Sequence, residues 1–69
     1  MVKIDLLDYG VYLEGKHIAD VDYLDYAKLF AKTMATNKGV STTVINNFTG
    51  EIVTEFVAKQ RIEIVEVEP

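Results

Sequence analysis

The chain has 69 residues, of which 49% are hydrophobic and 26% charged, with seven basic and eleven acidic side chains and no cysteine. This length predicts a single domain over residues 1–69, and the composition is that of a folded protein rather than a disordered one. The lack of cysteine excludes a disulfide scaffold, a thiolate metal site and a cysteine nucleophile. A folded chain this short buries about 60% of the surface that its unfolded form exposes, so its core is small.

The formal net charge of −4 is distributed unevenly. Residues 1–27 carry −4, residues 28–50 carry +3 on three lysines, and residues 51–69 carry −3. Because affinity for nucleic acids comes largely from basic side chains that displace counterions from phosphates, we expect an acidic chain not to bind them. No apolar stretch approaches the ~20 residues that span a bilayer, and the N-terminus lacks the pattern of a signal peptide. We therefore expect a cytoplasmic protein without membrane contact.

Two short apolar segments around Glu14 and Gly15 predict a hairpin near the N-terminus. Residues 11–13 and 16–19 flank this pair, and a glycine in the turn tolerates the positive φ that a tight hairpin needs. Before it, residues 2–6 alternate apolar and charged side chains, which predicts a half-buried strand. The alternation fails over residues 7–10, so we expect a bend or a bulge near Gly10.

Residues 23–37 are predicted to form the single helix. Asp22 lies where a side chain can accept hydrogen bonds from the free amides of the first turn, so it is the expected N-cap. Gly39 follows the last periodic residues, as is typical of a helix end. The predicted buried stripe joins positions three and four apart, namely Leu24, Ala27, Ala31, Met34 and Ala35, and is widened by Tyr23 and Phe30.

The C-terminal half predicts a second hairpin and a last strand. Residues 40–45 are rich in β-branched side chains, residues 46–50 have turn composition, and the alternation from residue 51 on predicts the second arm. Residues 62–67 predict a final strand, with a bulge where the phase shifts between Ile64 and Val65. The expected fold class is α+β: one helix packed on one face of a mostly antiparallel sheet of four to five strands, in the order β-β-α-β-β(-β).

Reactive side chains form few patterns that indicate chemistry. His17 is the only histidine, and Asp20 lies three residues further on. That spacing on a strand places two side chains on opposite faces, so we expect no acid–base pair and a solvent-facing His17. Asp20, Asp22 and Asp25 lack the glycine and the distant glutamate of a calcium loop, so strand end, cap and first-turn acid are their expected roles. We expect no catalytic residue, no metal and no cofactor.

Surface contacts remain as candidates for function. Tyrosine is favoured at interfaces because its ring supplies rigid apolar area and its hydroxyl a polar tip. Tyr12 alternates with Val11 and Leu13 and should face away from them, whereas Tyr26 lies off the buried stripe of the helix and is the best exposed candidate. The alternative interpretation is that the tyrosines line the rim of a small core.

Two further features can contact a partner. Phe48, at the tip of the second turn, either folds back over the sheet or anchors a partner. The last strand can pair with a partner's strand or a second copy if it lies at the sheet edge. The expected partner-binding residues are therefore Tyr12, Tyr26, Phe48, Ile62 and Ile64.

The sequence favours a non-enzymatic protein-interaction module, such as a small adaptor, inhibitor or accessory subunit, with a homodimer as one form. The small size and acidic charge are compatible with a phage or mobile-element accessory protein that binds a host factor. One alternative is nucleic-acid binding through Lys28, Lys32 and Lys38 with Tyr26, and another is a small-ligand binder or an enzyme around His17. The helix, strand, turn and strand of residues 22–57 recur in many unrelated small domains and indicate no family.

Overall fold

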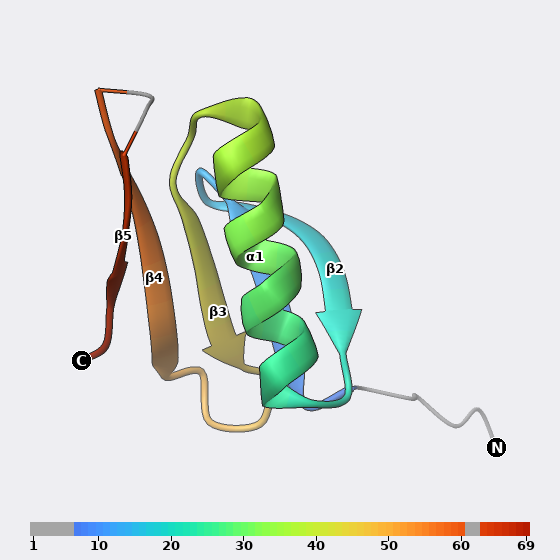
Figure 1. Ribbon diagram of the computed structural model, residues 1–69. Coiled ribbons are helices and arrows are strands. Elements are labelled where there is room, and N and C mark those ends of the chain that lie inside the picture. Colours follow the sequence, from blue (N-terminus) through green and yellow to red (C-terminus); the bar gives the residue numbers. More distant parts are fainter. Residues whose placement is uncertain (1–6, 61–62) are drawn as a thin grey trace, which may run out of the picture.

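The computed structural model describes residues 7–60 and 63–69, which form one helix and five strands (Figure 1). The strands are β1 (Tyr9–Leu13), β2 (Lys16–Val21), β3 (Thr42–Asn46), β4 (Ile52–Lys59) and β5 (Glu63–Val67), and the helix is α1 (Leu24–Lys38). This order confirms the expected α+β fold class. The strand predicted over residues 2–6 and the predicted contact residue Ile62 lie outside the described residues.

All the strand pairs are antiparallel, and the sheet order is β2-β1-β3-β4-β5. After β2 the chain crosses one face of the sheet as α1 and returns beside β1 as β3 (Figure 1). The first hairpin is confirmed: Glu14 and Gly15 have φ angles of 49° and 83°, and two positive values are what a two-residue mirror-image turn requires. Among the described residues, β2 and β5 are the two edge strands.

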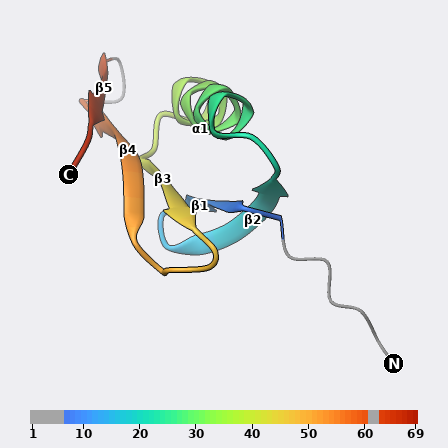
Figure 2. The ribbon, with the colours of Figure 1, turned by 90° about the horizontal axis from the view of Figure 1, so that it is seen from below.

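The core lies between α1 and the sheet, which curls around the helix (Figure 2). The helix contributes three fully buried alanines, whose small side chains let its backbone approach the strands closely. The sheet contributes larger side chains to fill the space, so the two surfaces are complementary in size. These core residues are Ala27, Ala31 and Ala35 from α1, and Val11, Val44 and Phe56 from β1, β3 and β4.

The helix ends at the predicted stop, Gly39, but it begins one residue later than predicted, at Leu24. Gly39 adopts the left-handed conformation with φ of 66°, and its N–H donates to the Ala35 carbonyl at 2.8 Å. The N-cap is Tyr23, not Asp22, and no side chain caps the first turn. The Asp22 prediction is wrong because Asp22 lies one position before the cap. Among the described residues α1 is the one helix. It has 15 residues and is not long and apolar enough to cross a membrane.

One of the two predicted irregularities is confirmed. The chain bends at Asp8, just before β1, and the β1–β2 register shifts between Val11 and Tyr12, where β2 contains Ile18 as an extra residue. Gly10 itself pairs regularly with both neighbouring strands. The bulge predicted at Ile64 and Val65 is absent from the β4–β5 pairing, which has a continuous register. Ile64 packs against the core and Val65 lies on the other face, so β5 is apolar on both faces without any irregularity.

Candidate functional site

A side-chain network links the first hairpin to the turn between β3 and β4. His17 Nε2 donates to Asp20 Oδ1 at 2.8 Å, and Asn47 Nδ2 donates to the same oxygen at 2.9 Å. Asn47 Nδ2 also donates to the Leu7 carbonyl at 2.7 Å. A Cβ on Gly10 would lie 2.7 Å from Asn47 Oδ1, so a glycine is needed there for this arrangement.

The contact between His17 and Asp20 corrects the expectation that the two side chains lie on opposite faces. Ile18 is the extra residue of the bulge in β2, so the alternation of faces is interrupted between His17 and Asp20. Both side chains therefore lie on the face of the sheet away from α1. The sequence contains the residues of this pair, but the bulge that brings them together depends on the pairing with β1.

The network orients an imidazole without enclosing it. The side chains of His17 and Asp20 are 47% and 32% exposed, which confirms the solvent-facing position of His17. Hydrogen bonds from His17 and then Asn47 hold the pKa of the Asp20 carboxyl below its usual value of 3.8. The Tyr12 ring lies 5.1 Å from the imidazole, centroid to centroid. Tyr12 thus faces away from the helix, as predicted, and packs on the network. The described residues include no group of three or more potential metal ligands.

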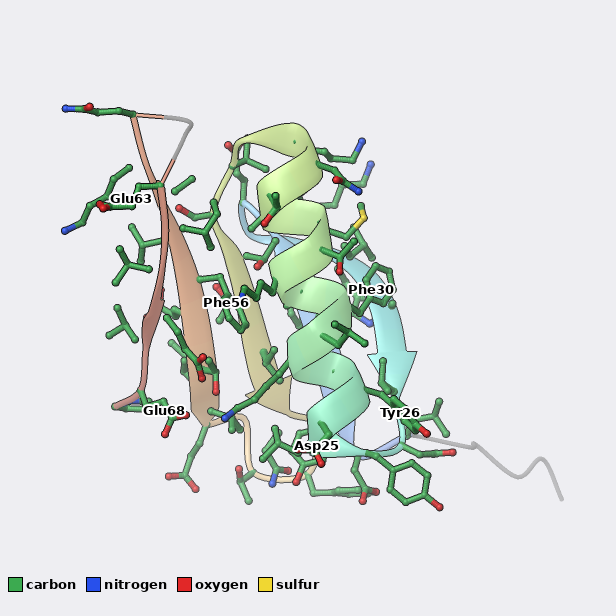
Figure 3. The ribbon with its side chains drawn as sticks, viewed as in Figure 1. Asp25, Tyr26, Phe30, Phe56, Glu63 and Glu68 are labelled. Carbon is green, nitrogen blue, oxygen red and sulfur yellow. The ribbon has the colours of Figure 1, made fainter. Side chains whose placement is uncertain are left out.

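A second candidate site lies at the N-terminal end of α1, where large side chains are exposed together. The exposed fractions of Tyr23, Tyr26 and Leu29 are 65%, 63% and 62%. The two tyrosine rings lie 5.8 Å apart and meet edge to face at 73°. Together with Asp25 they line an open hollow of about 470 Å³. Figure 3 shows Asp25 and Tyr26 at this end of the helix. We call Tyr23, Asp25, Tyr26 and Leu29 the tyrosine surface.

The sequence predicted one member of the tyrosine surface and missed the other three. Tyr26 was expected to be exposed, and it is. Tyr23 was expected to widen the buried stripe, but helical spacing does not apply to it because it is the N-cap and lies before the first helical residue. Leu29 lies on the side of α1 opposite the buried alanines, where a leucine is unexpected. The sequence did contain a signal for Leu29, because it is an apolar residue outside the predicted buried stripe of the helix.

The remaining predicted contact residues are dispersed over the molecule. Phe48 is 65% exposed at the turn between β3 and β4, where its N–H donates to Asn46 Oδ1 at 2.9 Å. Phe48 therefore does not fold back over the sheet, and its ring is left exposed. The Ile64 side chain packs against the core, so the outer edge of β5 offers its backbone but not this side chain. The structure does not gather Tyr12, Tyr26 and Phe48 on one surface.

The lysines of α1 do not form a single surface with Tyr26. Lys28 Nζ contacts Glu68 Oε1 at 2.8 Å and Glu66 Oε2 at 3.3 Å, which joins α1 to the end of the chain. The contact with Glu68 raises the pKa of Lys28 and lowers the pKa of Glu68. Since each helical residue turns the direction of the side chain by ~100°, Lys28 and Tyr26 lie on opposite sides of α1.

Comparisons of this chain with protein-family models, with curated proteins and with solved structures find no match.

Proposed function

We propose that this chain is a non-enzymatic protein-interaction module that binds a partner protein through the tyrosine surface. One observation carries the proposal: Tyr23 occupies the N-cap of α1, is largely exposed and makes no capping hydrogen bond. Ser, Thr, Asp or Asn at this position would stabilise the helix by about 1 kcal/mol. A residue type that does not suit its local backbone position, and that gains no compensating contact in the fold, is expected where function requires it.

The neighbours of Tyr23 support the same proposal. Tyr26 and Leu29 expose most of their side chains beside it, although a core of this size would gain from burying them. Tyrosines combine apolar area with a hydrogen-bonding tip and lose little entropy on binding, which is why they are enriched among the residues that dominate interface energies. Charged residues are depleted at interface centres, and Tyr26 and Leu29 form the apolar centre of this surface.

The outer edge of β5 is a second route to a protein contact. Among the described residues, β5 is an edge strand with a continuous register. The backbone groups on its outer side can therefore pair with an added strand. The bulge makes the other edge strand, β2, a poorer template. We give this route second place, because the exposed side chains of β5 include Glu63 and Glu66, and charged residues on an edge strand disfavour unspecific pairing.

Co-purification from a cell lysate together with sedimentation of the purified chain tests the proposal. Tyr26→Ser is expected to release proteins that the unmodified chain retains. Phe48→Ser removes a ring of similar exposure from the turn between β3 and β4 and is expected to retain them. A second copy is the partner if the chain sediments as a dimer and Tyr26→Ser makes it monomeric. A monomeric chain that retains no protein, or equal losses in both variants, would contradict the proposal.

A further inference from the structure

We infer that the hollow lined by Tyr23, Asp25 and Tyr26 binds a cationic side chain, arginine above all, that an exposed basic segment of a partner protein presents, with the Asp25 carboxylate as its acceptor. This inference rests on the proposed function and names the chemistry of the partner at the same surface.

The shape of the hollow suits a flat cation at the end of a flexible side chain. The two rings stand at 73° with their centroids 5.8 Å apart, so they contact each other edge to face and leave ring faces uncovered beside the contact. Cations bind over the negative face of an aromatic ring within ~6 Å of its centre. Arginine adds a planar guanidinium that stacks on a ring and donates to a carboxylate at the same time. The volume of about 470 Å³ admits such a group, and the open outer side admits the chain that carries it.

The charges around the hollow favour a cation over an anion. Residues 22–27 contain Asp22 and Asp25 and no lysine or arginine. Lys28 lies three residues after Asp25 on the neighbouring face of α1, and its ammonium contacts Glu66 and Glu68 at 3.3 and 2.8 Å. The N-terminal end of a helix attracts anions through its partial positive charge. In this helix Asp25 already supplies the negative charge within the first turn, so a further anion would be repelled by it.

A neutral ligand would account for the exposed rings of Tyr23 and Tyr26 but not for the carboxylate of Asp25 beside them. An apolar partner helix or a sugar would use Tyr23 and Tyr26 equally well, and it would leave the Asp25 carboxylate to be desolvated without a counter-charge. A cationic side chain uses all three lining residues. The two cases differ in one measurable way, because binding of a cation weakens when Asp25 loses its charge and when salt is added.

The test is an NMR titration of the ¹⁵N-labelled full chain with a short peptide that carries two arginines. The same peptide with citrulline in place of arginine keeps the shape and removes the charge. We expect the arginine peptide to shift the amide resonances of residues 23–26 and the citrulline peptide to leave them in place. With Asp25→Asn, the dissociation constant should rise about two- to five-fold, the range for one exposed ion pair.

Two further variants separate loss of the site from other effects. Tyr23→Ser removes one ring while adding a good capping residue, so a loss of binding in this variant does not come from a loss of folding. Glu63→Gln removes the same charge as Asp25→Asn from the opposite end of the molecule and should leave binding unchanged (Figure 3).

Equal binding of both peptides, or equal weakening by Asp25→Asn and Glu63→Gln, would overturn the cation site. If Tyr26→Ser still releases a partner protein in that case, the interaction module stands without it. If the arginine peptide binds as expected and no partner is retained, the site stands and the proposed function falls.

Discussion

Two threonine hydroxyls are buried in the same core but have different surroundings. Thr42 and Thr54 lie on neighbouring strands, and both side chains are fully buried. The Thr42 hydroxyl donates to the Ala31 carbonyl at 2.8 Å and so ties β3 to α1. The Thr54 hydroxyl has no hydrogen-bond partner among the described residues. A buried hydroxyl that makes no hydrogen bond costs about 1–3 kcal/mol, so the two positions should respond oppositely to its removal.

Valine has nearly the shape of threonine, which makes the paired substitutions a direct comparison. Thr54→Val is expected to raise the free energy of unfolding by about 1 kcal/mol, because it removes an unpaired polar group. Thr42→Val is expected to lower it by about 1 kcal/mol, because it removes a hydrogen bond that is made. Urea denaturation followed by circular dichroism measures both values. Changes of the same sign in the two variants would contradict this account of the core.

Asp20 predicts a pH dependence with a definite sign. Its pKa is lower in the folded chain than its usual value of 3.8, so the unfolded state binds the proton more readily. The resulting stability is present in full above pH 5 or so and is lost as the pH falls through the lower, folded pKa. Asp20→Asn keeps an acceptor oxygen for His17 and Asn47 but does not titrate. Its free energy of unfolding should therefore fall less than that of the unmodified chain between about pH 5 and about pH 3. Parallel curves for the two proteins would show that the network does not stabilise the charged form.

At the scale of the element, α1 combines a well-formed end with a poorly formed beginning. Gly39 terminates the helix with a left-handed residue and a hydrogen bond to Ala35, whereas the first turn has no side-chain cap. Asp25 still places a negative charge in the first turn and Lys38 a positive one in the last, which suits the helix dipole. The stability of α1 therefore depends on packing of its alanine face more than on its N-terminus.

Tyr23→Ser should stabilise the fold while removing a ring from the tyrosine surface. The backbone of Tyr23 is extended, with φ of −115° and ψ of 140°, which is the conformation from which a serine hydroxyl accepts from the first-turn amides. We expect the free energy of unfolding to rise by about 0.5–1 kcal/mol, and thermal denaturation measures it. Tyr26→Ser, three residues into the same helix, offers no cap and should give no such gain. A destabilised Tyr23→Ser variant would show that the ring has a structural role.

At the scale of the whole molecule, the sheet is held on one side by α1 along most of its width, and β5 is its least secured strand. β5 has one strand neighbour among the described residues, and its polar link to the helix is the contact of Lys28 with Glu66 and Glu68. Ile64 adds an apolar contact to the core. The other face of the sheet has no helix over it in the described part of the chain (Figure 2). The strand register places Tyr12, His17 and Asp20 on that face.

Lys28→Gln is expected to loosen β5 without affecting β1 or β3. The substitution removes the charge that holds Glu66 and Glu68 beside the helix, so the β5 amides should exchange with deuterium faster in NMR or mass-spectrometric measurements. Lys32→Gln removes the same charge one turn further along α1 and serves as the control. The difference between the two variants should shrink near 1 M salt, where exposed ion pairs are screened. Uniform exchange over all strands would show that the chain opens as one unit.

Most of the secondary structure follows from patterns that extend over a few residues. The turn at Glu14 and Gly15, the helix end at Gly39, the turn at residues 46–50 and the single helix were all predictable, because each depends on a local φ preference or on a short period of apolar side chains. The same patterns led to the α+β class, since an amphipathic helix between strands needs a sheet face to cover it.

The sites depended on the tertiary structure, because they are set by pairing between distant segments. Ile18 becomes an extra residue only against β1, and that shift brings His17 and Asp20 together. The contact of Lys28 with Glu68 spans 40 positions in sequence, and only the curl of the sheet brings the last strand to the helix. Tyr23 is exposed because the helix begins after it, a boundary that no periodicity marks. Local chemistry therefore determined the elements of this protein, and the register between strands decided which side chains meet.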